Sequence, residues 1–508
     1  MKTAASLLFC LTALAGCAAG PDYHVPQPDT PPNFAAQSTA TEPASASASM
    51  AAPDLADWWR SLEDTELNSL VERAIKSNPD VGVALIRLQQ ARTYEAVVVG
   101  HAAPKLDATA AAGRGTGSDL TRARAEQALR SADNSAGLQH INTLAGFDAV
   151  WELDLFGKFR REIEAARYDM QAAAAARNAV ITSIIADVVR AYLDLRGFQT
   201  QVGILRNASE VLQESLRIVN IRYERGITNE LDVALAAREL DTLQAQIAPL
   251  NAQVNALEYT LAALVGEYPE NILQELSAPN LIPSMPAPVA SGVPLDLLKR
   301  RPDILQAERE LGAASARIGV ATAELFPQVT LVGSIGSQGQ GWGTAPSVAK
   351  HIWSFGPGAV WPLLDFGALD AKVDIARLAA HAGLVNYRKT ILNAVREVDT
   401  ALDAYNAQQD RLKNLGDAMM AAQRAVDLAK ARYDRGLTDF LNVVDAERQF
   451  YGLQEQYAAA QVAEGEQFVR LYRSLGGGWQ NYQSIPDIHR PQPAIIAAFR
   501  RTLSSSAP

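Results

Sequence analysis

Residues 222–233 read RYERGITNELDV, and residues 432–443 read RYDRGLTDFLNV. The two stretches are the same motif, 210 positions apart, and the match extends outward without a gap across residues 149–266 and 359–476. Self-similarity over such a length at a fixed offset indicates an internal duplication. We therefore expect two copies of one structural unit, with related elements in the same order.

Each copy begins with a helix-start signal. Residues 78–80 are Asn-Pro-Asp and residues 301–303 are Arg-Pro-Asp. A proline in the first turn and an acid near the positive end of the helix dipole favour this start. These signals lie 223 positions apart, so the first copy has 13 additional residues, which indicates a longer loop. Helices are predicted from these prolines to about residues 102 and 325.

Two segments with a period of two follow in each copy. They predict strands at residues 105–113 and 141–154 in the first copy, and at 328–337 and 352–363 in the second. Alternate residues of the 141–154 strand share one face and are mostly apolar: Thr143, Ala145, Phe147, Ala149, Trp151 and Leu153. The sequence therefore predicts two hairpins, each with one apolar face.

After each hairpin the period changes to about 3.6, which indicates helices. Long helices are predicted at residues 157–225 and 367–435, with return helices at 231–265 and 441–475. A long helix of this size would measure on the order of 100 Å. An apolar stripe runs along the first one: Ile181, Ile185, Val188, Tyr192, Leu195, Val202 and Leu205.

The predicted strands are too few to form a barrel within one chain. Four strands leave two free edges, and closed membrane barrels have at least about eight strands. If the strands enter lipid, several copies must therefore join, and a cyclic arrangement would close the wall. The fold class is mainly α with a transmembrane β part.

The N-terminus predicts secretion and lipidation. An apolar run over residues 4–15 is too short to span a bilayer and fits a signal peptide, residues 1–16. Residues 14–17, Leu-Ala-Gly-Cys, resemble the bacterial lipobox, in which the cysteine is acylated. Cys17 would then be the only cysteine of the mature chain, which excludes an intrachain disulfide. By resemblance to lipoprotein sorting, Ala18 indicates the outer membrane.

The sequence divides into six segments. They are the signal peptide 1–16, a lipid-anchored extended tether 17–53, the first repeat 54–266, a linker or equatorial segment 267–300, the second repeat 301–478 and a C-terminal tail 479–508. The tether is rich in Pro, Ala, Ser and Thr and has no apolar period, which is typical of an extended linker.

Composition and motifs exclude several functions. Without residues 1–16 the chain has 45 basic and 56 acidic residues, a net charge of −11, so nucleic acid is an unexpected partner. The six histidines lack metal-ligand spacing, and no nucleotide loop or nucleophile elbow occurs. We therefore expect no enzyme activity, no metal and no cofactor other than covalent lipid on Cys17.

Several of these stretches resemble the TolC and OprM outer-membrane factors, and most closely the NodT-type lipoprotein branch of that family. They are residues 20–23 (Gly-Pro-Asp-Tyr), 58–59 (Trp-Trp), 151–157, 300–304 (Arg-Arg-Pro-Asp-Ile) and the two Tyr-X-Arg-Gly turns. The resemblance covers residues 17 to about 478. It implies a homotrimer with a twelve-stranded β-barrel in the outer membrane of a Gram-negative bacterium, a twelve-helix α-barrel through the periplasm and an equatorial domain.

The resemblance also implies a function and partners. The trimer would be the exit duct of a tripartite pump that confers multidrug resistance, together with a periplasmic adaptor and an inner-membrane pump of the RND type. The turns at Arg225-Gly226 and Arg435-Gly436 would be the periplasmic tips that contact the adaptor. They are also expected to cap their helices, because a glycine after a basic last turn commonly ends a helix.

The resemblance further implies a gate at the start of the last helix. The matching positions are Leu441 and Asp445, and Asn442 stands where some family members have another acid. Three leucines around an axis would exclude water, and three close carboxylates would repel one another. We therefore interpret Leu441 and Asp445 as the residues that set the closed diameter.

Other interpretations are open at this stage. The duct could carry secreted proteins instead of small molecules. The chain could also be a structural coiled-coil lipoprotein, which predicts no hairpins. Trp151 and Trp361 could anchor at the lipid interface or fill the junction between strand and helix.

Overall fold

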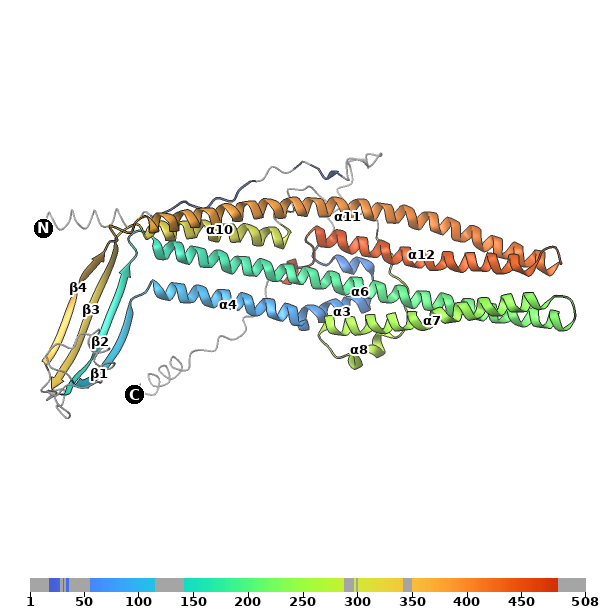
Figure 1. The fold of residues 1–508 in the computed structure, drawn as a ribbon, viewed down its shortest axis with the longest axis horizontal. Helices are drawn as coiled ribbons and strands as arrows, with labels where there is room; N and C mark the ends of the chain where they lie inside the picture. Colours follow the sequence, from blue (N-terminus) through green and yellow to red (C-terminus); the bar gives the residue numbers. More distant parts are fainter. Residues whose placement is uncertain are drawn as a thin grey trace. The chain divides into compact units, whose positions relative to one another are not determined.

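The computed structural model describes residues 18–27, 31, 33–35, 55–114, 141–286, 297, 300–340 and 350–482. The predicted signal peptide, the lipidation site Cys17, most of the tether and residues 483–508 of the tail lie outside them. The described residues are mainly helical and contain one sheet (Figure 1).

The chain forms two compact units, and neither unit is one of the repeats. Unit 1 takes residues 90–172 from the first repeat and 307–387 from the second, together with the N-terminal segment. Unit 2 takes the remaining parts of both repeats. Each unit therefore contains equivalent segments of both repeats, and the two repeats do not form two separate domains.

Unit 1 contains an antiparallel sheet in the order β1-β2-β3-β4 (Figure 1). Its strands are β1 (Lys105–Arg114), β2 (Ile141–Leu153), β3 (Gln328–Gln340) and β4 (Lys350–Val360). The pairing of β2 with β3 joins the hairpins of the two repeats into one sheet. β4 was expected to continue to residue 363 but ends at Val360, because its ladder partner Gln328 is the first residue of β3.

One face of the sheet is apolar and open. Phe147 lies opposite Ile335, and Ile335 lies opposite Trp353, so the three side chains form a row across three strands. All three are exposed, as are Leu106 and Phe355. A soluble sheet would cover such a row with another layer, so this face requires an apolar environment.

The opposite face of the sheet is polar. Asp148 lies opposite Ser334, which in turn lies opposite Ser354. The Thr109 hydroxyl donates to Asp148 at 2.8 Å, and the Ser334 and Ser354 hydroxyls lie 2.8 Å apart. The sheet thus separates an apolar side from a side that water can wet.

The two tryptophans at the strand ends make the same contact in both repeats. The Trp151 indole N–H donates to the carbonyl of Ala102 at 3.0 Å, just after α4 (Pro79–His101). Trp361 donates to Leu325 at 3.1 Å, just after α10 (Pro302–Ala323). These bonds favour the junction interpretation, because each indole ties a strand to the short helix of its own repeat.

The first described residues are held against unit 1. The buried Arg161 donates to the carbonyl of Ala19 at 3.1 Å and to Asp22 at 2.6 Å. The Tyr23 hydroxyl donates to the buried Glu308 at 2.9 Å. The sequence predicts a free tether from residue 17, but residues 19–23 make specific contacts with the fold.

Four long helices supply most of unit 2. They are α6 (Lys158–Glu224), α7 (Glu230–Val265), α11 (Ala368–Asp434) and α12 (Phe440–Ser474). Their ends lie within one residue of the predicted ends. The first parts of two of them, α6 and α11, belong to unit 1. α6 is long and apolar enough to span a bilayer, but 56% of its most apolar stretch is buried, as in the core helix of a folded domain.

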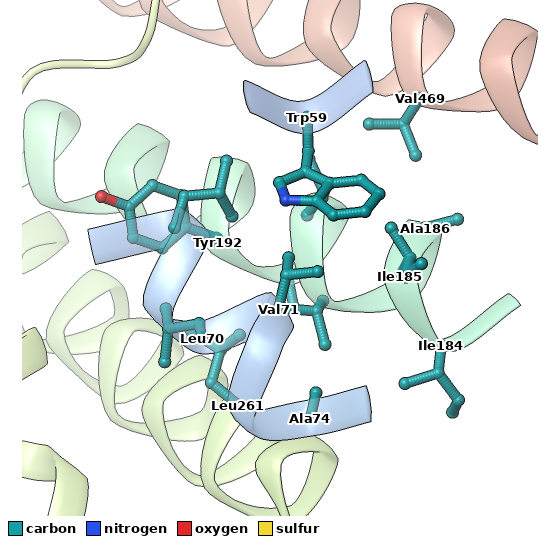
Figure 2. Packing of buried hydrophobic residues seen from close by; sticks show 14 of the residues in the cluster. Trp59, Leu70, Val71, Ala74, Ile184, Ile185, Ala186, Tyr192, Leu261 and Val469 are labelled. Carbon is teal, nitrogen blue, oxygen red and sulfur yellow. The ribbon is translucent and has the colours of Figure 1, made fainter. Parts of the chain in front are cut away.

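The core of unit 2 surrounds Trp59, which is fully buried. Figure 2 shows its indole ring among Val71, Ile185 and Val469. All seven residues of the predicted α6 stripe are buried. Four short elements that the sequence analysis did not predict also belong to this unit: η1 (Trp58–Leu62), α3 (Thr65–Ser77), α8 (Pro269–Leu276) and η2 (Gln480–Tyr482).

A buried cation ties the segment after α8 to this core. The Arg196 guanidinium is fully buried and donates to Glu66 at 2.5 Å and to the carbonyl of Ala278 at 2.8 Å. It also lies 4.8 Å from the centre of the Tyr192 ring. A buried charge is tolerated only when it is paired in this way, so these contacts fix the start of the predicted equatorial segment.

Candidate functional site at the helical turns

The two turns that join the long helices have the same backbone. We name residues 225–229 the first turn and residues 435–439 the second turn. Gly226 has φ +70° and Gly436 has φ +71°, the left-handed region that favours glycine. In the first turn the N–H of Gly226 bonds Tyr223 and that of Ile227 bonds Arg222, both at 2.9 Å. The second turn repeats both bonds, so each is a Schellman cap.

The arginines of the turns face solvent. Arg225 and Arg435 are exposed, and neither makes an ion pair with a described residue. The structure thus leaves the predicted contact residues accessible.

A contact between the two repeats that the sequence did not predict lies beside the turns. The Arg222 guanidinium stacks 4.5 Å from the centre of the Tyr433 ring and lies 3.7 Å from Asp434. Its counterpart Arg432 makes no ion pair or ring contact with a described residue. The repeated Arg-Tyr pair was the available signal, but only the fold shows that one copy's arginine reaches the other copy's tyrosine.

The start of α12 is fixed by apolar packing. Phe440, Val443 and Val444 are buried against Val219 of α6 and Ala236 of α7. The N-cap residue Asp439 makes no side-chain capping bond. Apolar packing therefore fixes the start of α12. The other residues in the first helical turn of α12 point away from the apolar cluster.

The two predicted gate residues lie on the open side of that helix start. Leu441 is 55% exposed, although it is large and apolar. Asp445 follows one turn later, so it shares the face of Leu441, and it pairs with the exposed Arg448 at 2.7 Å. The Asn442 side-chain amide donates to the Thr438 hydroxyl at 2.8 Å. Leu441 and Asp445 are thus both exposed, and Asp445 is paired with Arg448.

One ion pair with a buried carboxylate joins α12 to α11 near this region. Glu447 is almost fully buried and lies 2.7 Å from Lys430 of α11. Burial and the nearby Glu447 carboxylate raise the pKa of Tyr451 to about 12. Tyr451 therefore stays neutral at physiological pH.

A pocket opens between α6 and the start of α12. Its volume is about 420 Å³, and its apolar lining includes Val211, Ile218 and Phe440. Glu214 and Lys430 lie in the same lining. The pocket is large enough for one or two side chains of a partner. Within the described ranges, no group of three or more His, Cys, Asp or Glu is placed to hold a metal.

Comparison with known sequences identifies the family. The sequence model of the outer membrane efflux proteins matches residues 70–267 and 293–477 of this chain. The chain belongs to that family. The match spans both repeats, in agreement with the resemblance seen in the motifs.

Individual relatives agree over nearly the whole chain. Nodulation protein T of Rhizobium leguminosarum bv. viciae is 31% identical over 504 residues, 97% of this chain and 96% of that protein. The pyoverdine export outer membrane protein OpmQ of Pseudomonas aeruginosa is 30% identical over 431 residues, 85% of this chain and 89% of OpmQ. The solved structure of the outer-membrane channel OprN has a TM-score of 0.80 and 34% identity, covering 91% of this chain and 100% of that one.

As an outer membrane efflux protein, the chain acts in the outer membrane as an exit duct for efflux. The alternative of a structural coiled-coil lipoprotein is wrong, because it predicts no hairpins and the described residues form a four-stranded sheet. The roles of Cys17, the two turns and the two gate residues remain predictions.

Proposed function

We propose that three copies of this chain form one passive duct for small molecules, with a β-barrel in the outer membrane and an α-helical tube through the periplasm. The observation that carries this proposal is the sheet with one exposed apolar face, one polar face and outer edges at β1 and β4 that pair with no described strand. Unsatisfied backbone groups cost several kcal/mol each in lipid. The sheet therefore needs neighbours at both edges.

Copies of the same chain are the simplest neighbours. If β1 of one copy pairs with β4 of the next, three copies supply twelve strands and leave no edge, which exceeds the about eight strands of the smallest membrane barrels. The apolar row at Phe147, Ile335 and Trp353 would then face lipid, and the polar row at Asp148 would face the water-filled lumen.

Lipid attached to Cys17 would add a second anchor. Acyl chains hold a protein to one leaflet without spanning the membrane. The contacts of Ala19 and Asp22 with Arg161 support this proposal, since they fasten the chain close behind the acylated residue. The spanning part would be the barrel alone.

The closed end of the duct would be formed by Leu441 and Asp445. The exposure of Leu441 supports this role, because three such side chains can meet on an axis and exclude water. Three Asp445 carboxylates at close range would repel one another unless Arg448 or a cation compensates. Separation of the α12 starts would open the duct.

The partner that separates them would be a periplasmic adaptor, which also joins the duct to an inner-membrane pump of the RND type. The exposed Arg225 and Arg435, the glycine caps and the 420 Å³ pocket support adaptor docking at the turns. Small molecules are the cargo that the relatives' names suggest, pyoverdine being the one named for OpmQ. No catalytic step is required of the chain.

Single-channel conductance tests the gate. The double variant L441A/D445A should conduct more than wild type in a planar bilayer, because it removes the apolar plug and the ring of charge. The matched control is L231A/L235A, at the equivalent positions of the first repeat. Equal conductance of L441A/D445A and wild type would remove both residues from the gate.

Susceptibility of a deletion strain tests the cargo. Loss of this chain should lower the inhibitory concentration of dyes, detergents, antibiotics or metals at least fourfold. Unchanged susceptibility together with loss of secreted proteins would instead favour a protein-secretion duct.

A further inference from the structure

Unit 2 contains a polar cavity where α10 begins and α12 ends. Its volume is about 440 Å³, far from the turns in sequence. Four cationic and two anionic side chains line it, which gives a net charge of +2: Arg301, Arg396, Arg470, Arg473, Asp303 and Glu397. A cavity with this excess of arginine attracts anions.

One arginine already uses both carboxylates. Arg301 is buried and bonds Asp303 in a bidentate manner, at 3.0 and 2.7 Å, and Glu397 at 2.8 Å. It also donates to the carbonyl of Ser474 at 2.9 Å. Glu397 lies 4.0 Å from Arg396, too far for a hydrogen bond. Arg301 and Arg396 therefore share the two carboxylates, and Arg470 and Arg473 make no ion pair with either of them.

The guanidinium groups of Arg470 and Arg473 make no ion pair or hydrogen bond with any residue in the part of the chain that the structure describes. They lie three positions apart on α12, so their side chains share one face and repel each other. Both line the same cavity. An anion between them would remove this repulsion and satisfy several N–H donors at once.

A buried hydroxyl gives an independent indication of a ligand. Thr182 of α6 lines the cavity and is 7% exposed, and its hydroxyl has no hydrogen-bond partner among the described residues. A buried hydroxyl without a partner destabilises the fold, because it has lost its bond to water. A ligand oxygen in the cavity would accept its hydrogen.

The first repeat shows that helix capping does not require these charges. Asn78 is the counterpart of Arg301, and its amide donates at 2.8 Å to the carbonyl of Leu264, the counterpart of Ser474. Thr260 and Ala263 stand where the second repeat has Arg470 and Arg473. The same junction is thus built without arginine in one copy and with excess arginine in the other.

We propose that this cavity binds a small oxyanion of the phosphate class, as free phosphate or as a phosphomonoester. Arginine binds phosphate through two parallel N–H donors, and a dianion matches the net charge of +2. Arg470 and Arg473 supply the charge, the Thr182 hydroxyl supplies a neutral donor, and Arg301 with its two carboxylates forms the fixed wall. The site is independent of the proposed gate.

Calorimetric titration of the detergent-solubilised full-length protein with inorganic phosphate, at constant ionic strength in chloride, tests the proposal. The variant R470Q/R473Q should bind phosphate at least tenfold more weakly than wild type, and T182V about threefold more weakly. The matched control R411Q/R424Q removes two exposed arginines of α11 and should bind within twofold of wild type.

Competition with glycerol phosphate distinguishes the two sources of the anion. Displacement of phosphate assigns the site to a phosphomonoester, and failure to displace it assigns the site to the free ion. The proposal is overturned if wild type does not bind phosphate in chloride, or if R411Q/R424Q loses as much affinity as R470Q/R473Q.

Discussion

The helices α6 and α11 descend from one repeat and have 67 residues each, yet they meet different surroundings. The predicted stripe of α6 is buried by η1, α3, α7 and α12. α11 leaves large apolar side chains exposed along its length: Ile375, Leu378, Val385, Leu392 and Leu428. The comparison teaches that equivalent helices of the two repeats bury different shares of their apolar surface, and the proposed trimer would cover what α11 leaves exposed.

The largest expected effect is loss of assembly after a charged substitution on the exposed apolar surface of α11. We expect L378E/L392E to abolish assembly, because six glutamates per trimer would be buried against apolar neighbours. Size-exclusion chromatography with light scattering in detergent measures it, and the control L378M/L392M should assemble normally. A trimer of L378E/L392E with normal yield would show that this surface faces water.

An intermediate effect is expected where the short helix of each repeat meets the return helix. Loss of the capping residue there should lower the free energy of unfolding more in the second repeat than in the first. R301Q should destabilise by about 3 kcal/mol, because it leaves Glu397 without its buried partner. N78A should cost about 1 kcal/mol, because it removes a neutral cap that bonds the N–H of Asp80 at 2.8 Å. Thermal melting followed by circular dichroism compares the two variants. Equal decreases in melting temperature would contradict a larger cost for R301Q than for N78A.

The smallest effect concerns Asp194 of α6, whose counterpart in α11 is Ala404. Burial and the carboxylate of Glu466 on α12 raise the pKa of Asp194 to about 6, and Arg190 partly opposes this. The folded state thus holds a proton more tightly than the unfolded chain, and stability falls as pH rises from about 4 to about 6.

D194N should therefore stabilise the protein above pH 6 by about 1 kcal/mol, less than the full shift implies because the carboxylate is partly exposed to water. The gain should vanish below about pH 4. Melting temperatures at pH 7.5 and 4 measure it, and a gain of equal size at both values would mean that charge is not its cause.

The sequence predicts the elements well where their periodicity is long. The strands and long helices each extend over at least nine residues, and the duplication allows every assignment to be checked in a second copy. α3 and α8 lie outside the residues that the two copies share, so no second copy supported them, and they were missed. The division into units could not be predicted either, because it depends on which copy packs against which.

The site could be predicted only in part. Glycine caps follow from local sequence, since Gly226 and Gly436 adopt the conformation that their position after a basic turn indicates. The stacking of Arg222 on Tyr433 joins residues 211 positions apart, and nothing local specifies it. The same holds for the cavity at Arg301 and Arg470, which only the fold brings together.

The native mass of the detergent-extracted protein, recorded on the preparation that is used for conductance, tests the central claim most directly. The account predicts three chains of this sequence in the conducting species, because one chain supplies only four strands of the wall. A conducting species that contains a single chain would contradict it.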